Sequence, residues 1–205
     1  MNKDVNVDTS GVCNSATVAL KLAAATHETD GRVLWLTGLS GAGKSTLAYG
    51  LKHHLDSQGI QSVVLDGDAL RTGLNVDLGF SVEDRAENVR RVTEVARLFQ
   101  QAGFIVITAL ISPLHAQREA ARRTIGDGFF EIYVDARLAV CEARDPKGLY
   151  ARARRGEIQE FTGLSSPYEK PIAADLVIDT ERLTLQQSIG ILHCFALSAS
   201  RSSTA

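Results

Sequence analysis

The stretch RVLWLTGLSGAGKSTLAYG, residues 32–50, joins an apolar run to a helical pattern through a glycine-rich turn. The apolar run before the turn predicts a buried strand. Leu47, Leu51 and Leu55 then recur at the spacing of one helix face. Between the two, residues 38–45 read GLSGAGKS and match the phosphate-binding pattern GxxxxGK(S/T) in full. Because a P-loop lies between a strand and a helix, the context supports this interpretation.

The chemistry expected of this motif follows from its backbone. The glycines let N–H groups close around phosphate oxygens, and the following helix adds a favourable dipole. Lys44 is expected to reach the β- and γ-phosphates, and Ser45 to bind Mg²⁺. The alternative is a glycine-rich turn without a ligand, which the flanking strand and helix disfavour. The residues expected to contact ATP are Gly38, Leu39, Ser40, Gly41, Ala42, Gly43, Lys44, Ser45 and Thr46.

The motif indicates a nucleoside triphosphate but does not specify the reaction. A signalling GTPase would carry NKxD to read guanine and a DxxG glycine after the second strand, and the sequence has neither there. An oligomeric motor ATPase usually needs a longer chain. A small kinase that acts on a small molecule fits the 205 residues best.

Composition and charge fit one globular domain. Of the 205 residues, 44% are hydrophobic and 22% are charged, and the formal net charge is −2. That charge does not favour nucleic acid or an anionic membrane as a partner, and no apolar run is long enough for a transmembrane helix. Residues 1–30 lack the pattern of a secretory signal. Cys13, Cys141 and Cys194 are widely separated, so we expect free thiols in a reducing cytoplasm.

Strand and helix patterns alternate along the chain. The predicted strands cover residues 32–38, 60–68, 104–112, 129–135 and 174–180, and the predicted helices cover 44–59, 81–103, 113–126, 137–144 and 184–198. The alternation predicts an α/β fold, a P-loop NTPase-like three-layer sandwich with a mostly parallel, doubly wound sheet. We expect an N-terminal arm at 1–30, a P-loop kinase domain at 31–198 and a C-terminal tail at 199–205.

Local signals place several helix ends. Gly59 is expected to end the first helix, because glycine readily adopts the left-handed conformation found there. Ser81 is expected to cap the second helix, with Asp84 three residues further on. Pro113 is expected to open the third helix in its first turn.

Two aspartates, Asp66 and Asp68, follow the second predicted strand and face the expected ligand edge. Carboxylates are costly at the end of a buried strand unless they have partners. If the chain stays extended, both side chains lie on the same side. One carboxylate can then hold a metal-bound water while the other accepts a proton from an attacking hydroxyl. The alternative is an N-cap, with Asp68 opening a short helix at residues 69–74.

Further motifs accompany the P-loop: LDGD at 65–68, DRAENVRR at 84–91, ISP at 111–113, RDPKGLY at 144–150 and FTGLSSPYE at 161–169. Together they closely resemble the adenylylsulfate kinase family over about residues 30–180. The last two motifs are the most specific, since many families carry a P-loop. The resemblance implies an ATP-dependent phosphotransferase. It would move the γ-phosphate of ATP to the 3′-hydroxyl of adenosine 5′-phosphosulfate (APS), giving 3′-phosphoadenylyl sulfate and ADP.

The resemblance also implies Mg²⁺, a homodimer and a role in sulfate assimilation, and it leaves open a sulfurylase as a further partner. By the matched motifs, Asp68 is the base or orients the 3′-hydroxyl, and Asp66 holds the Mg²⁺ water shell. Arg144 is expected against the ATP adenine, through its planar guanidinium. The residues expected to bind APS are Asp68, Arg71, Phe80, Arg85, Asn88, Ile111, Ser112, Lys147 and Phe161. Core packing stays open as an alternative for the two phenylalanines.

Ser112 follows the third predicted strand. Some members of the family are described as forming a phosphoserine here, which would make this serine catalytic. Direct in-line transfer needs no such intermediate, and no evident base lies beside Ser112 in the sequence. A strand-end cap before Pro113, or a contact with the substrate, is equally open.

Residues 145–170, the lid segment, are rich in charge and glycine and have no obvious regular pattern. Such a length is unusual in a compact domain and favours a function. A kinase must exclude water, so we expect a mobile lid with hinges at Gly148, Gly156 and Gly163. The alternative is a long solvated loop.

Two other functions stay open. The first is a P-loop kinase for another small metabolite, such as a nucleoside, and the FTGLSSPYE motif argues against it. The second is an inactive regulatory partner of the sulfurylase. The complete set of Lys44, Ser45, Asp66, Asp68 and Arg85 argues against that role.

Overall fold

The computed structural model describes residues 31–198. The expected N-terminal arm at 1–30 and tail at 199–205 lie outside the described residues. Five parallel strands form one sheet in the order β2-β3-β1-β4-β5. The strands are β1 (Arg32–Thr37), β2 (Ser62–Asp66), β3 (Ile105–Ala109), β4 (Phe129–Asp135) and β5 (Leu176–Asp179). The predicted α/β fold with a doubly wound sheet is confirmed.

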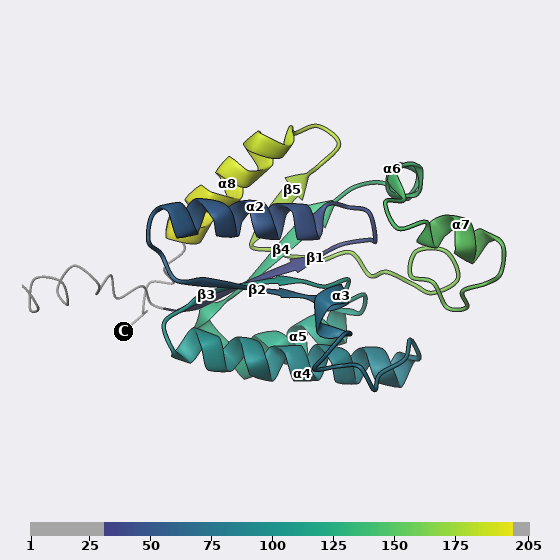
Figure 1. Cartoon of the computed structure of the whole chain (residues 1–205), viewed down its shortest axis with the longest axis horizontal. Helices are drawn as coiled ribbons and strands as arrows, with labels where there is room; N and C mark the ends of the chain where they lie inside the picture. The colour runs from purple at the N-terminus through teal and green to yellow at the C-terminus, as the bar shows by residue number, and fades with distance from the viewer. Residues whose placement is uncertain (1–30, 199–205) are drawn as a thin grey trace, which may run out of the picture.

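Helices cover both faces of the sheet, which makes three layers (Figure 1). α2 and α8 lie on one face, and α4 and α5 lie on the other. The helices are α2 (Lys44–Ser57), α3 (Gly67–Leu70), α4 (Val82–Gln101), α5 (His115–Ile125), α6 (Leu138–Arg144), α7 (Leu149–Arg154) and α8 (Leu185–Ser198), with a 3₁₀ turn at Gly126–Gly128. α6 and α7 lie beyond the end of the sheet (Figure 1).

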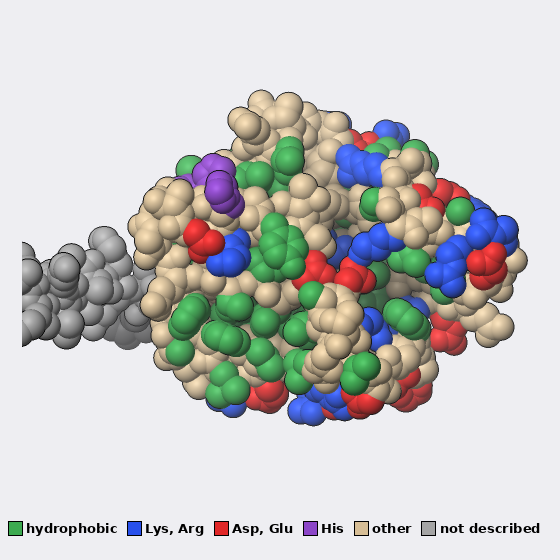
Figure 2. All heavy atoms as spheres, in the orientation of Figure 1, with side chains coloured by type: hydrophobic (Ala, Val, Ile, Leu, Met, Phe, Trp, Pro, Cys, Tyr) green, Lys and Arg blue, Asp and Glu red, His purple; other side chains and the backbone are tan. Residues whose placement is uncertain are grey.

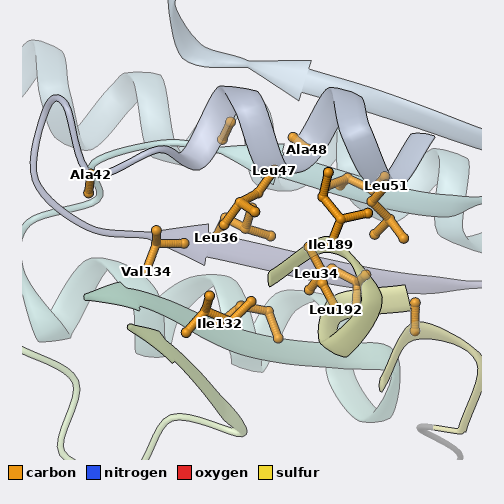
Figure 3. Close-up of a cluster of buried hydrophobic side chains, with 14 of the residues drawn as sticks. Leu34, Leu36, Ala42, Leu47, Ala48, Leu51, Ile132, Val134, Ile189 and Leu192 are labelled. Atoms are coloured by element: carbon orange, nitrogen blue, oxygen red, sulfur yellow. The ribbon is translucent and has the colours of Figure 1, made fainter. Parts of the chain in front are cut away.

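The central strand β1 is buried on both faces, and its alternating side chains enter two cores. Leu34 and Leu36 pack with α2 and α8, where Leu51 and Leu192 are also fully buried (Figure 3). Val33 and Trp35 point to the other face and pack under α4 and α5. This period-two alternation explains why the strand is almost entirely apolar.

The predicted helix ends hold at two sites. α2 ends at Ser57, and Gly59 adopts a positive φ of 72° while its N–H donates to the carbonyl oxygen of Asp56. Ser81 is the N-cap of α4, and its Oγ accepts a hydrogen bond of 3.1 Å from the main-chain N–H of Asp84. Both ends follow from local chemistry, so local patterns were sufficient to find them.

The structure corrects the expectation that Pro113 opens a helix. α5 begins at His115, and Leu114 is its N-cap. Ser112 does not cap it, because its Oγ accepts a hydrogen bond from the Trp35 indole instead. The main-chain N–H of His115 donates to Glu169, which is far away in sequence. A partner at that distance cannot be found from local capping rules.

The lid segment also differs from the expectation of irregular chain. It contains α7, a helix of six residues whose N-cap is Gly148. Asp145 accepts hydrogen bonds from the N–H groups of Tyr150 and Ala151 at 3.1 and 3.0 Å. A carboxylate at the start of a helix stabilises it. Six residues are too few to show helical periodicity against a background of charge and glycine.

No helix among the described residues is both long and apolar enough to cross a membrane.

Candidate active site

The P-loop connects β1 to α2 in a tight turn that needs glycine. Gly41 and Gly43 have φ values of 76° and 105°, a region that other residues rarely adopt. A Cβ atom on Gly41 would lie 2.8 Å from the carbonyl oxygen of Cys141 on α6. The loop therefore packs closely against α6, and its conformation depends on both glycines.

Lys44 is buried at the start of α2, with 8% of its surface exposed. Its Nζ donates to the carbonyl oxygens of Gly38 and Leu39 at 2.9 and 2.7 Å. Burial lowers the pKa of Lys44 to about 8, because the charged form loses its hydration. The ammonium group of Lys44 is therefore bound by the P-loop itself. A bound phosphate would take the place of the two carbonyl oxygens as its partner.

The two aspartates lie in different surroundings. Asp66 ends β2, is 6% exposed, and its Oδ1 accepts a 2.9 Å hydrogen bond from the main-chain N–H of Asp68. Asp68 is exposed and pairs with Lys147 of the lid segment. The chain turns into α3 at Gly67, so the extended conformation expected here is wrong. A short helix does form, but its N-cap is Asp66 and not Asp68.

Two arginines lie near this pair. Arg71 donates to the carbonyl oxygens of Leu78 and Gly79 and places its guanidinium 4.2 Å from the ring centre of Phe80. Desolvation lowers the pKa of Arg71, and the positive charge of Arg85 lowers it further. Desolvation also lowers the pKa of Arg85. Two half-buried cations that repel one another form a site that suits an anionic ligand.

Arg85 also joins α4 to the lid segment. It donates to Thr162 Oγ1 at 2.7 Å and to the carbonyl oxygens of Phe80 and Glu160. One helical turn further on, Asn88 is buried, and its Oδ1 accepts from Asn75 Nδ2 at 2.9 Å. The Oδ1 of Asn75 is buried and has no hydrogen-bond partner among the described residues.

The loop after β3 lies at the same edge of the sheet. Ser112 has a positive φ of 37°, which is unusual for a residue with a side chain. Its Oγ accepts a 3.1 Å hydrogen bond from Trp35 Nε1, and the residue is 3% exposed. The carbonyl oxygen of Ile111 accepts from Thr37 Oγ1 at 2.7 Å, which ties this loop to the end of β1.

Two aromatic side chains of the lid segment pack into the core. The rings of Tyr150 and Phe161 meet edge to face at 4.9 Å, and both are buried. Tyr150 also donates to the carbonyl oxygen of Ser40 in the P-loop at 2.9 Å. Phe80, the other aromatic residue expected at the acceptor site, is 63% exposed. In this structure Phe161 is a packing residue, whereas Phe80 has a free face.

The remaining predicted nucleotide contact, Arg144, is exposed beside the P-loop. It donates to Thr180 Oγ1 and to the Thr180 carbonyl oxygen at 3.0 and 2.8 Å, and to the Gly41 carbonyl oxygen at 3.4 Å. Thr180 Oγ1 in turn donates to the carbonyl oxygen of Ala42. The sequence analysis did not single out Thr180. Its position directly after the last strand, at the ligand edge of the sheet, could have indicated it.

A cavity of about 520 Å³ opens between the P-loop and the lid segment. Its wall includes Leu39, residues 136–138, residues 163–168 and Lys170. Acidic and basic side chains gather on the side of the molecule where α3, α6 and α7 lie (Figure 2). The structure therefore combines a phosphate-binding loop, two carboxylates and several cations at one end of the sheet.

Sequence reasoning also missed three residues that hold this end together. Tyr168 OH lies 3.1 Å from Thr37 Oγ1, and Arg118 donates to the Ser112 carbonyl oxygen. Glu131 pairs with Arg118. The available signals were an acidic residue inside the apolar strand FFEIYVD and the arginine that follows ISP.

A P-loop at a strand end, with carboxylates and arginines around it, is typical of the enzymes that transfer phosphate from a nucleoside triphosphate. The family model for adenylylsulphate kinase matches residues 30–179. The chain belongs to this family and is an ATP-dependent kinase.

Individual relatives agree with the family match. An adenylyl-sulfate kinase from Paraburkholderia xenovorans is 62% identical over 78% of this chain and 89% of its own length. The APS kinase of Mycobacterium tuberculosis in complex with AMPPNP and APS has a TM-score of 0.78 and 47% identity, covering 83% of this chain and 99% of that chain. A hexameric APS kinase from Thiobacillus denitrificans has a TM-score of 0.62 and 31% identity, covering 88% of this chain and 31% of that chain.

ATP affinity is expected to fall as the pH rises above about 8, the pKa of Lys44 in the free protein. Bound phosphates favour the charged ammonium and raise its pKa in the complex. Binding then takes up a proton between the two pKa values, and the association constant falls by up to about tenfold per pH unit. Titration calorimetry in buffers with different ionisation enthalpies measures both the affinity and the proton uptake.

Lys52→Met is the matched control, because Lys52 lies on the same helix and forms a half-exposed pair with Asp56. It should keep the wild-type pH dependence, whereas Lys44→Met should bind ATP weakly at every pH. A constant wild-type affinity, with no proton uptake, would contradict the role assigned to burial.

Proposed function

We propose that this kinase transfers the γ-phosphate of ATP to the 3′-hydroxyl of APS, forming 3′-phosphoadenylyl sulfate and ADP in sulfate assimilation. The observation that carries the proposal is the convergence of Lys44, Asp68 and the arginine pair Arg71 and Arg85 at one end of the sheet. The P-loop accounts for the donor, and the two arginines suit an acceptor with a phosphosulfate group.

Asp68 is the proposed base or orienting group for the 3′-hydroxyl. It is exposed at the start of α3, and its carboxylate contributes to the electrostatic surroundings of Lys44. Its partner Lys147 belongs to the lid segment. When substrate binds, Lys147 would exchange the carboxylate for the anionic groups of APS, which leaves Asp68 able to accept a hydrogen bond from the hydroxyl.

Asp66 and Ser45 are the proposed residues around Mg²⁺. One oxygen of the Asp66 carboxylate accepts the N–H of Asp68, and a carboxylate has a second oxygen for a metal-bound water. No group of three or more His, Cys, Asp or Glu side chains within residues 31–198 could hold a metal ion by itself. That agrees with Mg²⁺, which usually binds one or two carboxylates together with waters and phosphates. When bound, the ion neutralises charge on the phosphates.

The acceptor site is proposed to lie between α3, α4 and the loop after β3. Arg71 and Arg85 would hold the phosphosulfate, and Phe80 would stack on the adenine. Phe161 is buried and packs edge to face against Tyr150, so a movement of the lid segment is proposed to bring it to the adenine. The other proposed contacts with APS are Asn88, Ile111, Ser112 and Lys147.

The lid segment is proposed to close over both substrates and exclude water. Tyr150 reaches the P-loop, Lys147 reaches Asp68, and Thr162 contacts Arg85. Each contact joins the segment to a different part of the site. Water exclusion matters because ATP would otherwise be hydrolysed.

We also propose a cytoplasmic homodimer, with the sulfurylase that makes APS as a further partner. The separate cysteines support the compartment, and the hexameric relative supports self-association. Light scattering of the purified chain measures the mass, which for a dimer is twice 22.1 kDa.

The reaction itself is tested by incubating the protein with ATP, Mg²⁺ and APS and separating the nucleotides. The expected products are ADP and 3′-phosphoadenylyl sulfate in equal amounts. Nucleosides and sugars serve as control acceptors and should give little turnover. Absence of the phosphorylated product from folded protein, or faster turnover of a control acceptor, would reject the proposal.

Asp68→Asn is expected to lower the single-turnover rate by about 10²–10⁴, because it removes the proton acceptor and keeps the shape. ATP affinity should stay close to wild type, since the P-loop is unchanged. Asp56→Asn, at an exposed site on α2, is the control. If Asp68→Asn reacts at the wild-type rate, another group takes the proton.

Ser112→Ala is expected to keep a substantial fraction of the wild-type rate. The hydroxyl is buried and accepts a hydrogen bond from Trp35, and direct transfer does not need it as a nucleophile. Rapid quench with γ-labelled ATP would reveal any phosphoprotein. A folded variant without activity, together with label on the wild-type protein, would establish a covalent route instead.

A further inference from the structure

Arg118 of α5 is a buried cation, with 1% of its side chain exposed. Its Nε donates to Glu131 Oε1 at 2.5 Å, and the Glu131 side chain is 5% exposed. A buried ion pair of this kind is weak evidence for stability, because desolvation opposes the attraction between the charges. Its geometric consequences are therefore of greater interest than its energy.

The other two guanidinium nitrogens of Arg118 hold two main-chain carbonyl oxygens, one six residues away and one 51 residues away in sequence. One Nη donates to the carbonyl oxygen of Ser112 at 2.8 Å, and the other to the carbonyl oxygen of Glu169 at 2.8 Å. The planar group thereby joins β4, the loop after β3 and the end of the lid segment. A lysine has no planar fork and cannot hold three such acceptors in this arrangement.

Further hydrogen bonds connect Glu169, at the end of the lid segment, to Pro113 and His115. The N–H of Glu169 donates to the Pro113 carbonyl oxygen at 2.9 Å. The N–H of His115 donates to Glu169 Oε2 at 2.5 Å. Glu169 is therefore attached to the loop after β3 through its N–H, and to α5 through its carbonyl oxygen and its side chain. This end of the lid segment is a fixed anchor, and Arg118 is its buried centre.

The conformation of Ser112 needs such support. A residue with a side chain rarely has a φ of 37°, and strained residues persist where the surroundings hold them on several sides. Arg118 holds the carbonyl oxygen of Ser112, and Trp35 holds its hydroxyl. Movement of Arg118 would remove one hydrogen bond from Ser112 and one from Glu169, and so loosen both.

We propose that Arg118, oriented by Glu131, is a positioning residue that sets the acceptor loop at Ser112 and the lid anchor at Glu169 in one arrangement. It contacts neither the P-loop nor the proposed proton acceptor Asp68. Its effect is thus on acceptor binding and water exclusion, while ATP binding is independent of it. This inference rests on the proposed function for its kinetic part and on contacts alone for its conformational part.

The test uses Arg118→Lys, which keeps the charge opposite Glu131 but loses the fork. The KM for APS is expected to rise about tenfold or more, because a small displacement of a binding group is costly. The KM for ATP should stay within about twofold of wild type. ADP should also form in excess over phosphorylated product, since the lid excludes water less well.

Arg122→Lys is the matched control. Arg122 lies one turn further along α5 and also approaches Glu131, at 3.6 Å, but it pairs with Asp175 and with neither Ser112 nor Glu169. Its KM values and coupling should match wild type. A merely structural role for Arg118 would alter both KM values together or leave both unchanged, and either result in folded protein overturns the proposal.

Limited trypsin digestion gives a readout that does not need turnover. The lid segment contains Lys147, Arg152, Arg154 and Arg155, and a loosened anchor should speed cleavage there about fivefold or more. Arg122→Lys should be cut at the wild-type rate. If Arg118→Lys does not fold, a double variant, Arg118→Met with Glu131→Gln, removes both charges of the buried pair. This double variant is then used in place of Arg118→Lys in the kinetic and the digestion assays. Wild-type cleavage rates in the folded variant overturn the anchor, whereas an inactive wild-type protein would overturn only the proposed function.

Discussion

The buried cation at the start of α2 is the constraint on which the site depends. Lys44 loses most of its hydration and must be surrounded by oxygen atoms, which its own loop supplies through Gly38 and Leu39. The loop can curl back in this way only because Gly41 adopts a positive φ and lies directly against α6. The nucleotide-binding loop therefore depends on the helix that leads into the lid segment, and the two cannot be considered separately.

The charged side chains of the proposed APS site have unlike partners. Asp66 and Asp68 are neighbours in sequence, yet one is buried in a cap and the other reaches a lysine of the lid segment. Arg71 and Arg85 repel one another and are held by main-chain oxygens and a ring. The two arginines thus have neutral hydrogen-bond partners. A strongly anionic substrate can displace such partners at low cost.

Local patterns predicted the strands, the P-loop and the cap at Ser81, because each leaves a signal within a few residues. The turn at Gly67 and the six-residue helix α7 were too short to leave a periodic signal. The partners of Arg118, Tyr168 and Lys147 could not be predicted, since their contacts join residues that are far apart in sequence. Acidic Glu131 within an apolar strand and the arginine that follows ISP were the visible signs of such a network.

The chain has a single tryptophan, and its indole donates to the hydroxyl of Ser112. Trp35 is fully buried in β1, one residue from Leu36 in the main core. Its fluorescence therefore originates from one known place, next to Ser112 in the loop after β3. The protein consequently carries an intrinsic optical reporter, and changes in emission during substrate binding can be assigned to this loop without labelling.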